Sequence, residues 1–249
     1  MILDGHAHVG KGRKKWLEPS QLIDQMDRHG VDKAVVCPIE EHIVIYNKEG
    51  NDYILETVRS FPDRLIGFAS VNPWFGAPAL EELRRAIGEG LRGLKLNSCL
   101  QGFHITDEIL YPLVEQAAEL RIPIYFHTGT MVCAEPFQLA YLARRYPQVK
   151  FIMGHAGASD FWNDVIPATR RTPNLYLETS KTTPVTIMGM IEGESALHER
   201  VVFGSNLPTS SYPLELAKVR EAICDKDLLE QIMGKNMMAL LEGQGGDVG

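Results

Sequence analysis

The feature that most constrains the fold is an eightfold alternation of short apolar runs with longer amphipathic stretches. Runs that are apolar along their whole length are typical of buried parallel strands, because helices cover both faces of such a sheet. Eight strand–helix units in 249 residues predict a single α/β domain, a (β/α)8 or TIM barrel, at residues 1–241. The predicted strands are Met1–Asp4, Lys33–Cys37, Leu65–Val71, Arg92–Leu96, Pro123–His127, Val149–Gly154, Asn174–Thr179 and Arg200–Ser205.

Helix signals support this alternation. In "SQLIDQMDRHG", Leu22 and Met26 recur at helical spacing, Ser20 is a candidate N-cap and Gly30 is a candidate stop. Thr183 followed by proline is a second start of this kind. An open doubly wound sheet is the alternative, but no glycine-rich dinucleotide fingerprint follows any strand and the count of eight favours the barrel. The glycine-rich segment at residues 242–249 is expected to be a flexible tail.

Composition excludes several classes of function. The net charge of −7 does not suggest a nucleic-acid-binding protein. No run approaches the ~18 apolar residues that span a membrane, and no secretory signal begins the chain. The four cysteines are scattered without a C-x-x-C pair, so neither a disulfide framework nor a cysteine-based zinc site is expected. We therefore expect a cytoplasmic protein with reduced thiols, and small buried core residues at Cys37, Cys99 and Cys133.

Half of the eight histidines fall at the ends of predicted strands, where barrels carry their chemistry. Strand side chains alternate with a period of two, so His6 and His8 point to the same side and both imidazoles can reach one ion. A third imidazole, from His127, would come from across the barrel mouth, and His155 follows the next strand. A buried histidine is often only a hydrogen-bonded core residue, but four at strand ends favour a metal site for Zn²⁺ or a related divalent ion.

The chain resembles the amidohydrolase superfamily, in particular its mononuclear amidohydrolase-2 branch, which includes aminocarboxymuconate-semialdehyde decarboxylase. The motifs that carry the resemblance occur in order along the whole chain: "DGHAH", "GLKL", "IPIYFHTG", "VKFIMGHAG", "NLYLETS" and "VVFGSNLP". The resemblance implies that one divalent ion, with Zn²⁺ the first choice, is bound by His6, His8 and His127. It also implies that His155 contacts the substrate or a metal-bound water and acts as an acid, a base or an electrostatic helper.

One position departs from the family pattern. The last strand of this family normally ends in an aspartate that completes the metal shell and takes a proton from water, and Asn206 stands there instead. Asparagine can coordinate through its amide oxygen, but more weakly, and it cannot act as a general base. Three interpretations stay open: an engineered aspartate-to-asparagine variant, a natural enzyme in which another group handles the proton, and a pseudoenzyme that binds a ligand without converting it.

The leading hypothesis is a metal-dependent hydrolase that acts on a small, carboxylate-bearing substrate through a metal-activated water. A non-oxidative decarboxylase on the same scaffold and an inactive relative are the alternatives. Lys95, Arg13 and Lys181 are the candidate cations for an anionic substrate. Lys95 is expected to be structural or substrate-facing rather than a carbamylated bridge between two metals. A small-molecule partner is expected, nucleic-acid and membrane partners are not, and a homodimer is left open.

Overall fold

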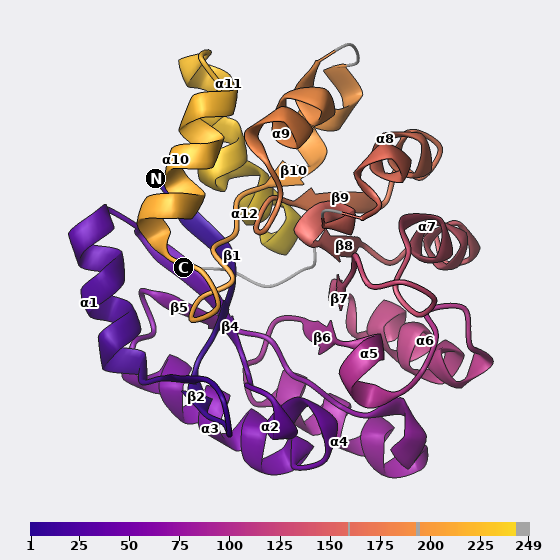
Figure 1. The fold of residues 1–249 in the computed structure, drawn as a ribbon. Coiled ribbons are helices and arrows are strands. Elements are labelled where there is room, and N and C mark those ends of the chain that lie inside the picture. Colours follow the sequence, from indigo (N-terminus) through magenta and orange to yellow (C-terminus); the bar gives the residue numbers. More distant parts are fainter. Residues whose placement is uncertain (159, 193–194, 243–249) are drawn as a thin grey trace.

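The computed structural model describes residues 1–158, 160–192 and 195–242, and it shows a closed barrel of parallel strands surrounded by helices (Figure 1). Two sheets make up the barrel, in the orders β1-β4-β5 and β10-β9-β8-β7-β6. Parallel bridges between Ala7 and Leu207 and between Ala69 and Leu94 join the two sheets at both edges. The eight barrel strands are β1 (Leu3–His8), β4 (Lys33–Cys37), β5 (Leu65–Gly67), β6 (Leu94–Leu96), β7 (Ile124–His127), β8 (Phe151–Gly154), β9 (Leu175–Glu178) and β10 (Val201–Val202).

Helices follow the strands in sequence and form the outer layer (Figure 1). An antiparallel hairpin of β2 (Gly10–Lys11) and β3 (Trp16–Leu17) lies between the first strand and the first helix. The α-helices are α1 (Pro19–His29), α2 (Glu41–Val44), α3 (Asn47–Ser60), α4 (Ala77–Gly88), α5 (Ser98–Gln101), α6 (Tyr111–Leu120), α7 (Pro136–Arg145), α8 (Trp162–Arg170), α9 (Pro184–Ile191), α10 (Tyr212–Ala222), α11 (Lys226–Glu230) and α12 (Asn236–Glu242). Short 3-10 turns lie at η1 (Pro73–Phe75), η2 (Glu108–Leu110), η3 (His155–Gly157) and η4 (Ser195–Arg200), and a π-turn lies at η5 (Gln231–Lys235).

The eight strands and the barrel predicted from the sequence are confirmed, with changes at the element ends. β1 extends to His8, so both histidines belong to the strand rather than to the loop after it. The N-cap of α1 is Glu18, not Ser20. The reason is a capping box: the Glu18 carboxylate accepts from the backbone N–H of Gln21, whose side chain accepts from the N–H of Glu18. At α9, Thr183 is the N-cap as expected and accepts from the N–H of Thr186.

Two hydrophobic layers hold the barrel together. The larger one lies between the strands and the surrounding helices. The smaller one fills the barrel interior and includes Leu3, Tyr125 and Ile152 from the strands, with Met237 and Leu240 from α12. α12 therefore closes one end of the barrel, and the other end is left for polar side chains. The helix continues to Glu242, one residue past the predicted domain limit, and the predicted flexible tail otherwise lies outside the described residues.

The first and last strands meet at a polar seam. A Cβ atom on Gly5 would lie 2.8 Å from the carbonyl oxygen of Phe203, so glycine is needed where β1 approaches the end of β10. Beside it, the Asp4 carboxylate accepts from the N–H of His6, from the N–H and the hydroxyl of Ser205, and from the hydroxyl of Tyr212. Burial raises the pKa of Asp4 to about 7, and these four hydrogen bonds oppose that rise.

A search of the described residues for a helix long and apolar enough to cross a membrane finds none.

Candidate metal centre and active site

Four histidines converge at the open end of the barrel. His6 and His8 lie on β1, His127 ends β7, and His155 begins η3 directly after β8. The ring centroids of His6 and His8 are 4.6 Å apart, those of His127 and His155 are also 4.6 Å apart, and those of His6 and His155 are 5.8 Å apart. The sequence prediction that these four side chains share one site is therefore consistent with the geometry, and their roles stay predictions.

The histidine rings are neutral. Burial lowers the pKa of all four well below the usual range of histidine, and of His8 to about 3. The positive charge of Lys95 lowers each of the four further. Neutral imidazoles carry one lone pair, so they are suited to bind a cation rather than to repel it.

Hydrogen bonds assign the proton of each β1 imidazole. His8 Nδ1 lies 2.7 Å from the carbonyl oxygen of Pro38, which can only accept, so Nδ1 carries the proton. Cys37 Sγ donates to the carbonyl of Ala7 and lies 3.9 Å from His6 Nδ1, so its sulfur accepts from that ring. Both Nε2 atoms are therefore unprotonated, which is the usual state of a metal-binding histidine, and His6 Nε2 accepts from Lys95 Nζ at 3.4 Å.

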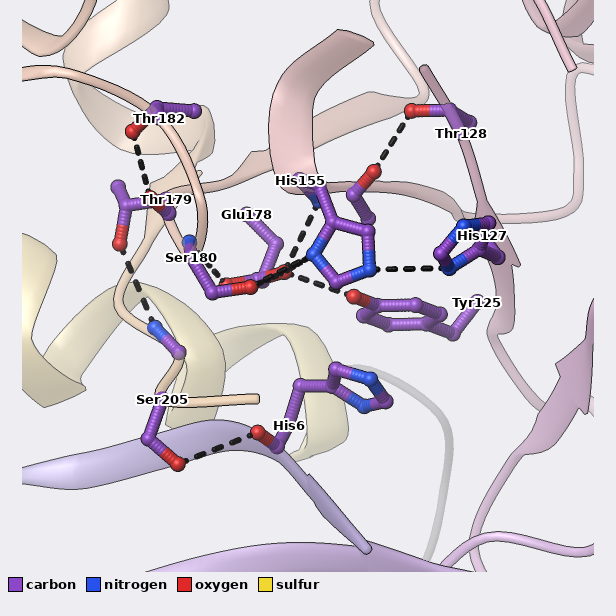
Figure 2. Close-up of polar contacts among 12 residues, drawn as sticks. His6, Tyr125, His127, Thr128, His155, Glu178, Thr179, Ser180, Thr182 and Ser205 are labelled. Carbon is purple, nitrogen blue, oxygen red and sulfur yellow. Dashed lines mark hydrogen bonds and ion pairs between the residues drawn. The ribbon is translucent and has the colours of Figure 1, made fainter. Parts of the chain in front are cut away.

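A chain of hydrogen bonds orients the other two histidines (Figure 2). The Ser180 hydroxyl donates to Glu178 Oε2 at 2.9 Å, so it must accept from His155 Nδ1 at 2.7 Å. His155 Nε2 then accepts from His127 Nδ1 at 3.0 Å, which leaves His127 Nε2 with a lone pair. The relay runs from the buried carboxylate through Ser180 and His155 to His127, and it gives His127 the same protonation state as the two histidines of β1.

Glu178 anchors this relay from inside the barrel. Its carboxylate also accepts from the Tyr125 hydroxyl at 2.7 Å, from the N–H of His155 at 3.0 Å and from the N–H of Ser180 at 2.5 Å. Burial raises the pKa of Glu178, while these donors favour its ionised form. In the sequence, Glu178 is visible only as the glutamate of the "NLYLETS" motif. Its role depends on contacts with Tyr125 on β7 and with His155 after β8.

Lys95 lies at the centre of the site. Its side chain is buried, with Nζ 3.4 Å from His6 Nε2 and 3.8 Å above the centre of the Tyr125 ring. The Tyr125 ring also stacks on His6, with centroids 4.1 Å apart. Burial lowers the pKa of Lys95 to about 7, and the charges of Lys181 and Lys15 act in the same direction. The position of Lys95 allows it to face a substrate bound at the histidines.

The charges of the outer cations act differently on the histidines. Lys181 follows β9, and its charge lowers the pKa of His8, His127 and His155. Arg13 lies exposed in the turn of the β2–β3 hairpin, and no effect of its charge on the histidines is found among the described residues. Lys15, from the same turn, acts on His8 and His127 instead. The roles of Arg13 and Lys181 in binding a substrate stay predictions.

Donor chemistry at the site fits a divalent metal ion. His6, His8 and Cys37 are the described residues whose ligand atoms lie within 4.8 Å of one another as a set of three. Burial raises the pKa of the Cys37 thiol to about 12, and its hydrogen bonds make it a support for the rings rather than an independent base. His127 lies outside this set, against His155. The ligand atoms of the predicted trio of His6, His8 and His127 therefore do not form a set within 4.8 Å of one another.

Asn206 lies beside β1, where its N–H donates to the carbonyl oxygen of His6 at 2.8 Å. Its backbone has a φ of 53°, a left-handed conformation that asparagine tolerates better than most residues. The residue is buried, and its side-chain amide makes no hydrogen bond to the described part of the chain. The amide oxygen is thus a candidate ligand next to His6, as the sequence predicted.

Comparisons with known proteins identify the family. Residues 4–242 match the sequence model of the amidohydrolase family, so the chain belongs to that family. A 2-amino-3-carboxymuconate-6-semialdehyde decarboxylase from Dictyostelium discoideum is 28% identical over 142 residues, which are 53% of this chain. That match spans only 39% of the length of the Dictyostelium protein.

Solved structures show the same fold. An uncharacterised TIM-barrel protein from Bordetella bronchiseptica superposes with a TM-score of 0.81 at 18% identity, covering 98% of this chain and 99% of the other. A dihydroxybenzoic acid decarboxylase from a Polaromonas species, solved with bound manganese and the inhibitor 2-nitroresorcinol, has a TM-score of 0.78 at 16% identity. The match covers 99% of this chain and 98% of the decarboxylase. The barrel prediction is thereby confirmed.

Proposed function

We propose that this member of the amidohydrolase family is a metal-dependent, non-oxidative decarboxylase of small, unsaturated or aromatic carboxylic acids. The observation that carries the proposal is the charge pattern of the site: the charges of three lysines act on the neutral imidazoles, and the two buried carboxylates, Asp4 and Glu178, are held by hydrogen-bond donors of the protein. This pattern favours binding of an anionic substrate over activation of water. The decarboxylases among the relatives support the same choice.

His6, His8 and His127 would hold the ion through their Nε2 atoms, with the Asn206 amide oxygen as a further neutral ligand. Three neutral imidazoles favour Zn²⁺ among the common ions, and manganese in the Polaromonas enzyme makes Mn²⁺ the second choice. A bound divalent ion supplies Lewis acidity, which polarises the oxygen atoms of the substrate.

The lysines would bind and protonate the substrate. Lys181 and Lys15 come from two different loops, their charges act on His8 and His127, and they would hold the substrate's carboxylate or a second anionic group. In the reaction the bond between the carboxyl carbon and its neighbour breaks, carbon dioxide leaves, and the electron pair stays on the neighbouring carbon. That carbon must gain one proton, and Lys95 Nζ, buried beside His6, is placed to donate it.

Hydrolysis would require a group that removes a proton from water. Asn206 cannot do so. Asp4 and Glu178 each accept four hydrogen bonds from the protein, and both are fully buried. To reach a water molecule, either carboxylate would have to leave its donors. That movement would leave buried N–H or O–H groups unpaired, which costs about 1–3 kcal/mol for each group.

One observation favours hydrolysis as the second candidate. The relay from Glu178 through Ser180 fixes His155 in a single tautomer, as expected for a histidine that handles protons. In a hydrolase, His155 would exchange its bond to His127 for a bond to water. The two reactions differ in their products, because hydrolysis adds water to the substrate and decarboxylation releases carbon dioxide.

The first experiment measures metal content per chain in protein purified without chelators. We expect about one zinc or manganese per chain, a large loss in His8→Asn, and no change in the control His42→Asn, which alters a histidine of α2 outside the proposed ligand set. A wild-type protein that binds no metal, even after titration with Zn²⁺ and Mn²⁺, would contradict the metal-dependent proposal.

The second experiment screens small carboxylic acids, lactones and amides with the metal-loaded protein. Release of carbon dioxide that is lost in His155→Asn and kept in His42→Asn supports decarboxylation. Products that have gained water, without release of carbon dioxide, would refute the decarboxylase and support the hydrolase. Ligand binding without any product would identify a pseudoenzyme.

A further inference from the structure

Cys99 and Cys133 form a pair of thiols that the proposed chemistry does not use. The two residues are 34 positions apart in sequence, yet their sulfur atoms lie 2.7 Å apart. A disulfide bond is about 2.05 Å long, so the two sulfur atoms are already less than ~1 Å from bonding distance. The sequence prediction that both are buried core residues is wrong, because Cys99 is exposed and Cys133 is half-buried. Their spacing in sequence gave no sign of the pair.

Both thiols are held by structured turns. Cys99 lies on α5, which is capped at its start by the Asn97 side chain and ends at Gly102 in a left-handed conformation. Cys133 lies in a turn closed by the bridge between Thr130 and Ala134. The carbonyl oxygen of Cys133 also accepts from the N–H of Ile105 at 3.2 Å, so a backbone hydrogen bond already joins the two loops.

The α7 helix start holds the turn that carries Cys133. Glu135 accepts from the N–H of Val132 at 3.1 Å, and Gln138 donates to the carbonyl oxygen of Val132 at 2.8 Å. Two anchored segments thus bring the thiols together, and a bond between them needs little change in the backbone. Cys37, in contrast, is buried beside His8. Cys224 is exposed near the C-terminal end of the chain, and no contact with another of the described cysteines is found for it.

We propose that Cys99 and Cys133 are a modification site, at which a small-molecule disulfide such as oxidised glutathione forms a reversible intramolecular disulfide. Each protein thiol loses one proton, and the two sulfurs together lose two electrons. The S–S bond of the oxidant breaks, accepts both electrons and both protons, and leaves as two thiols. Cys99 is the first nucleophile because it is the more exposed of the two, and Cys133 then displaces the bound half of the oxidant.

The bond would connect two loops of the catalytic face. Cys99 lies on α5, directly after β6, which carries Lys95. Cys133 lies in the loop that follows His127 at the end of β7. Oxidation therefore joins the segments after β6 and β7 outside the histidine cluster. The inference does not depend on which reaction the histidines support.

Thiol titration and peptide mapping of the folded protein test the proposal. Treatment with oxidised glutathione should remove two of the reagent-accessible thiols, and mapping should recover one peptide pair that links Cys99 to Cys133. The matched control Cys224→Ser should show the same loss of two thiols. In Cys99→Ser the pair cannot form, so oxidised glutathione should leave Cys133 free or as a mixed disulfide.

A second readout does not depend on thiol chemistry. A bond that spans 34 residues restricts the unfolded chain, so oxidised wild-type protein should melt several degrees above the reduced form, and Cys99→Ser should show no such shift. Stable glutathione adducts on Cys99 in the wild type, links between chains through Cys224, or unchanged thiol counts at high oxidant would each overturn the proposal.

Discussion

Replacement of Lys95 by methionine should stabilise the metal-free protein while it abolishes activity. Burial lowers the pKa of Lys95 from 10.5 to about 7. The unfolded chain, with its higher pKa, therefore binds the proton more tightly than the folded protein does between these two values. The contribution of Lys95 to folding stability is therefore least favourable below pH 7, where the folded protein must carry the buried charge, and it improves as the pH increases toward 10.5. Methionine has a similar length and no charge, so it removes this cost.

The magnitude follows from the pKa difference. A shift of about 3.5 pH units corresponds to about 5 kcal/mol at ~1.4 kcal/mol per unit, which is the full cost at low pH. Between pH 6 and pH 9, the difference in unfolding free energy between Lys95→Met and wild type should fall by about 2–3 kcal/mol as the wild-type lysine loses its proton.

Urea unfolding of both proteins in the presence of a chelator, at intervals of one pH unit, measures this difference. Lys235→Met is the matched control, because Lys235 is exposed and pairs with Glu230 on the surface. Its difference from wild type should not change with pH over the same range. A Lys95→Met difference that is also constant from pH 6 to pH 9 would refute the reasoning, because Lys95 would then keep an ordinary pKa in the folded protein.

Three other substitutions have defined outcomes. Asn206→Asp adds a negative charge beside neutral imidazoles and should increase Zn²⁺ affinity about tenfold or more in calorimetry, a gain of ~1.4 kcal/mol; unchanged affinity would mean that position 206 does not contact the ion. In Glu178→Gln the side-chain amide can be oriented in two ways, and in both its N–H group faces a donor that now has no acceptor. Urea unfolding should therefore show a free energy of unfolding that is lower by about 2–4 kcal/mol. A loss under ~1 kcal/mol would show that the carboxylate is normally protonated. Asn174→Ala removes a buried amide that donates to three backbone carbonyls at and after the end of α7, and its unfolding free energy should fall by about 2–4 kcal/mol without change in metal content. Loss of metal in this variant would show that the effect extends to the site.

Local sequence patterns determine much of this fold. The strands were predictable because they are buried on both faces. A run such as "KAVVC", with one charged residue followed by four apolar ones, indicates a buried strand of this kind. The common side of His6 and His8 follows from strand periodicity alone. Element ends were less predictable, and Glu18 replaced Ser20 as a cap because Gln21 completes a capping box with it.

The chemistry around the histidines was not predictable from such patterns. The proton positions depend on Pro38, on Ser180 and on a thiol at Cys37, and each of these contacts joins segments that are distant in sequence. The choice among the outer cations could not be made from the sequence either. Arg13 and Lys15 are two residues apart in one turn, and the course of the β2–β3 hairpin decides which of them lies near the site.

The seam between β1 and β10 has a consequence for how the protein folds. Asp4 and Ser205 are 201 positions apart, and contacts of such long range form late because closing a long loop costs chain entropy. The proposed metal site crosses this seam, with His6 on one side and Asn206 on the other. A chain that has formed its helices and most strand pairs would still lack a complete site. Metal uptake would then be a kinetic probe of barrel closure, and it should follow the slowest refolding phase rather than the early gain of helical circular dichroism.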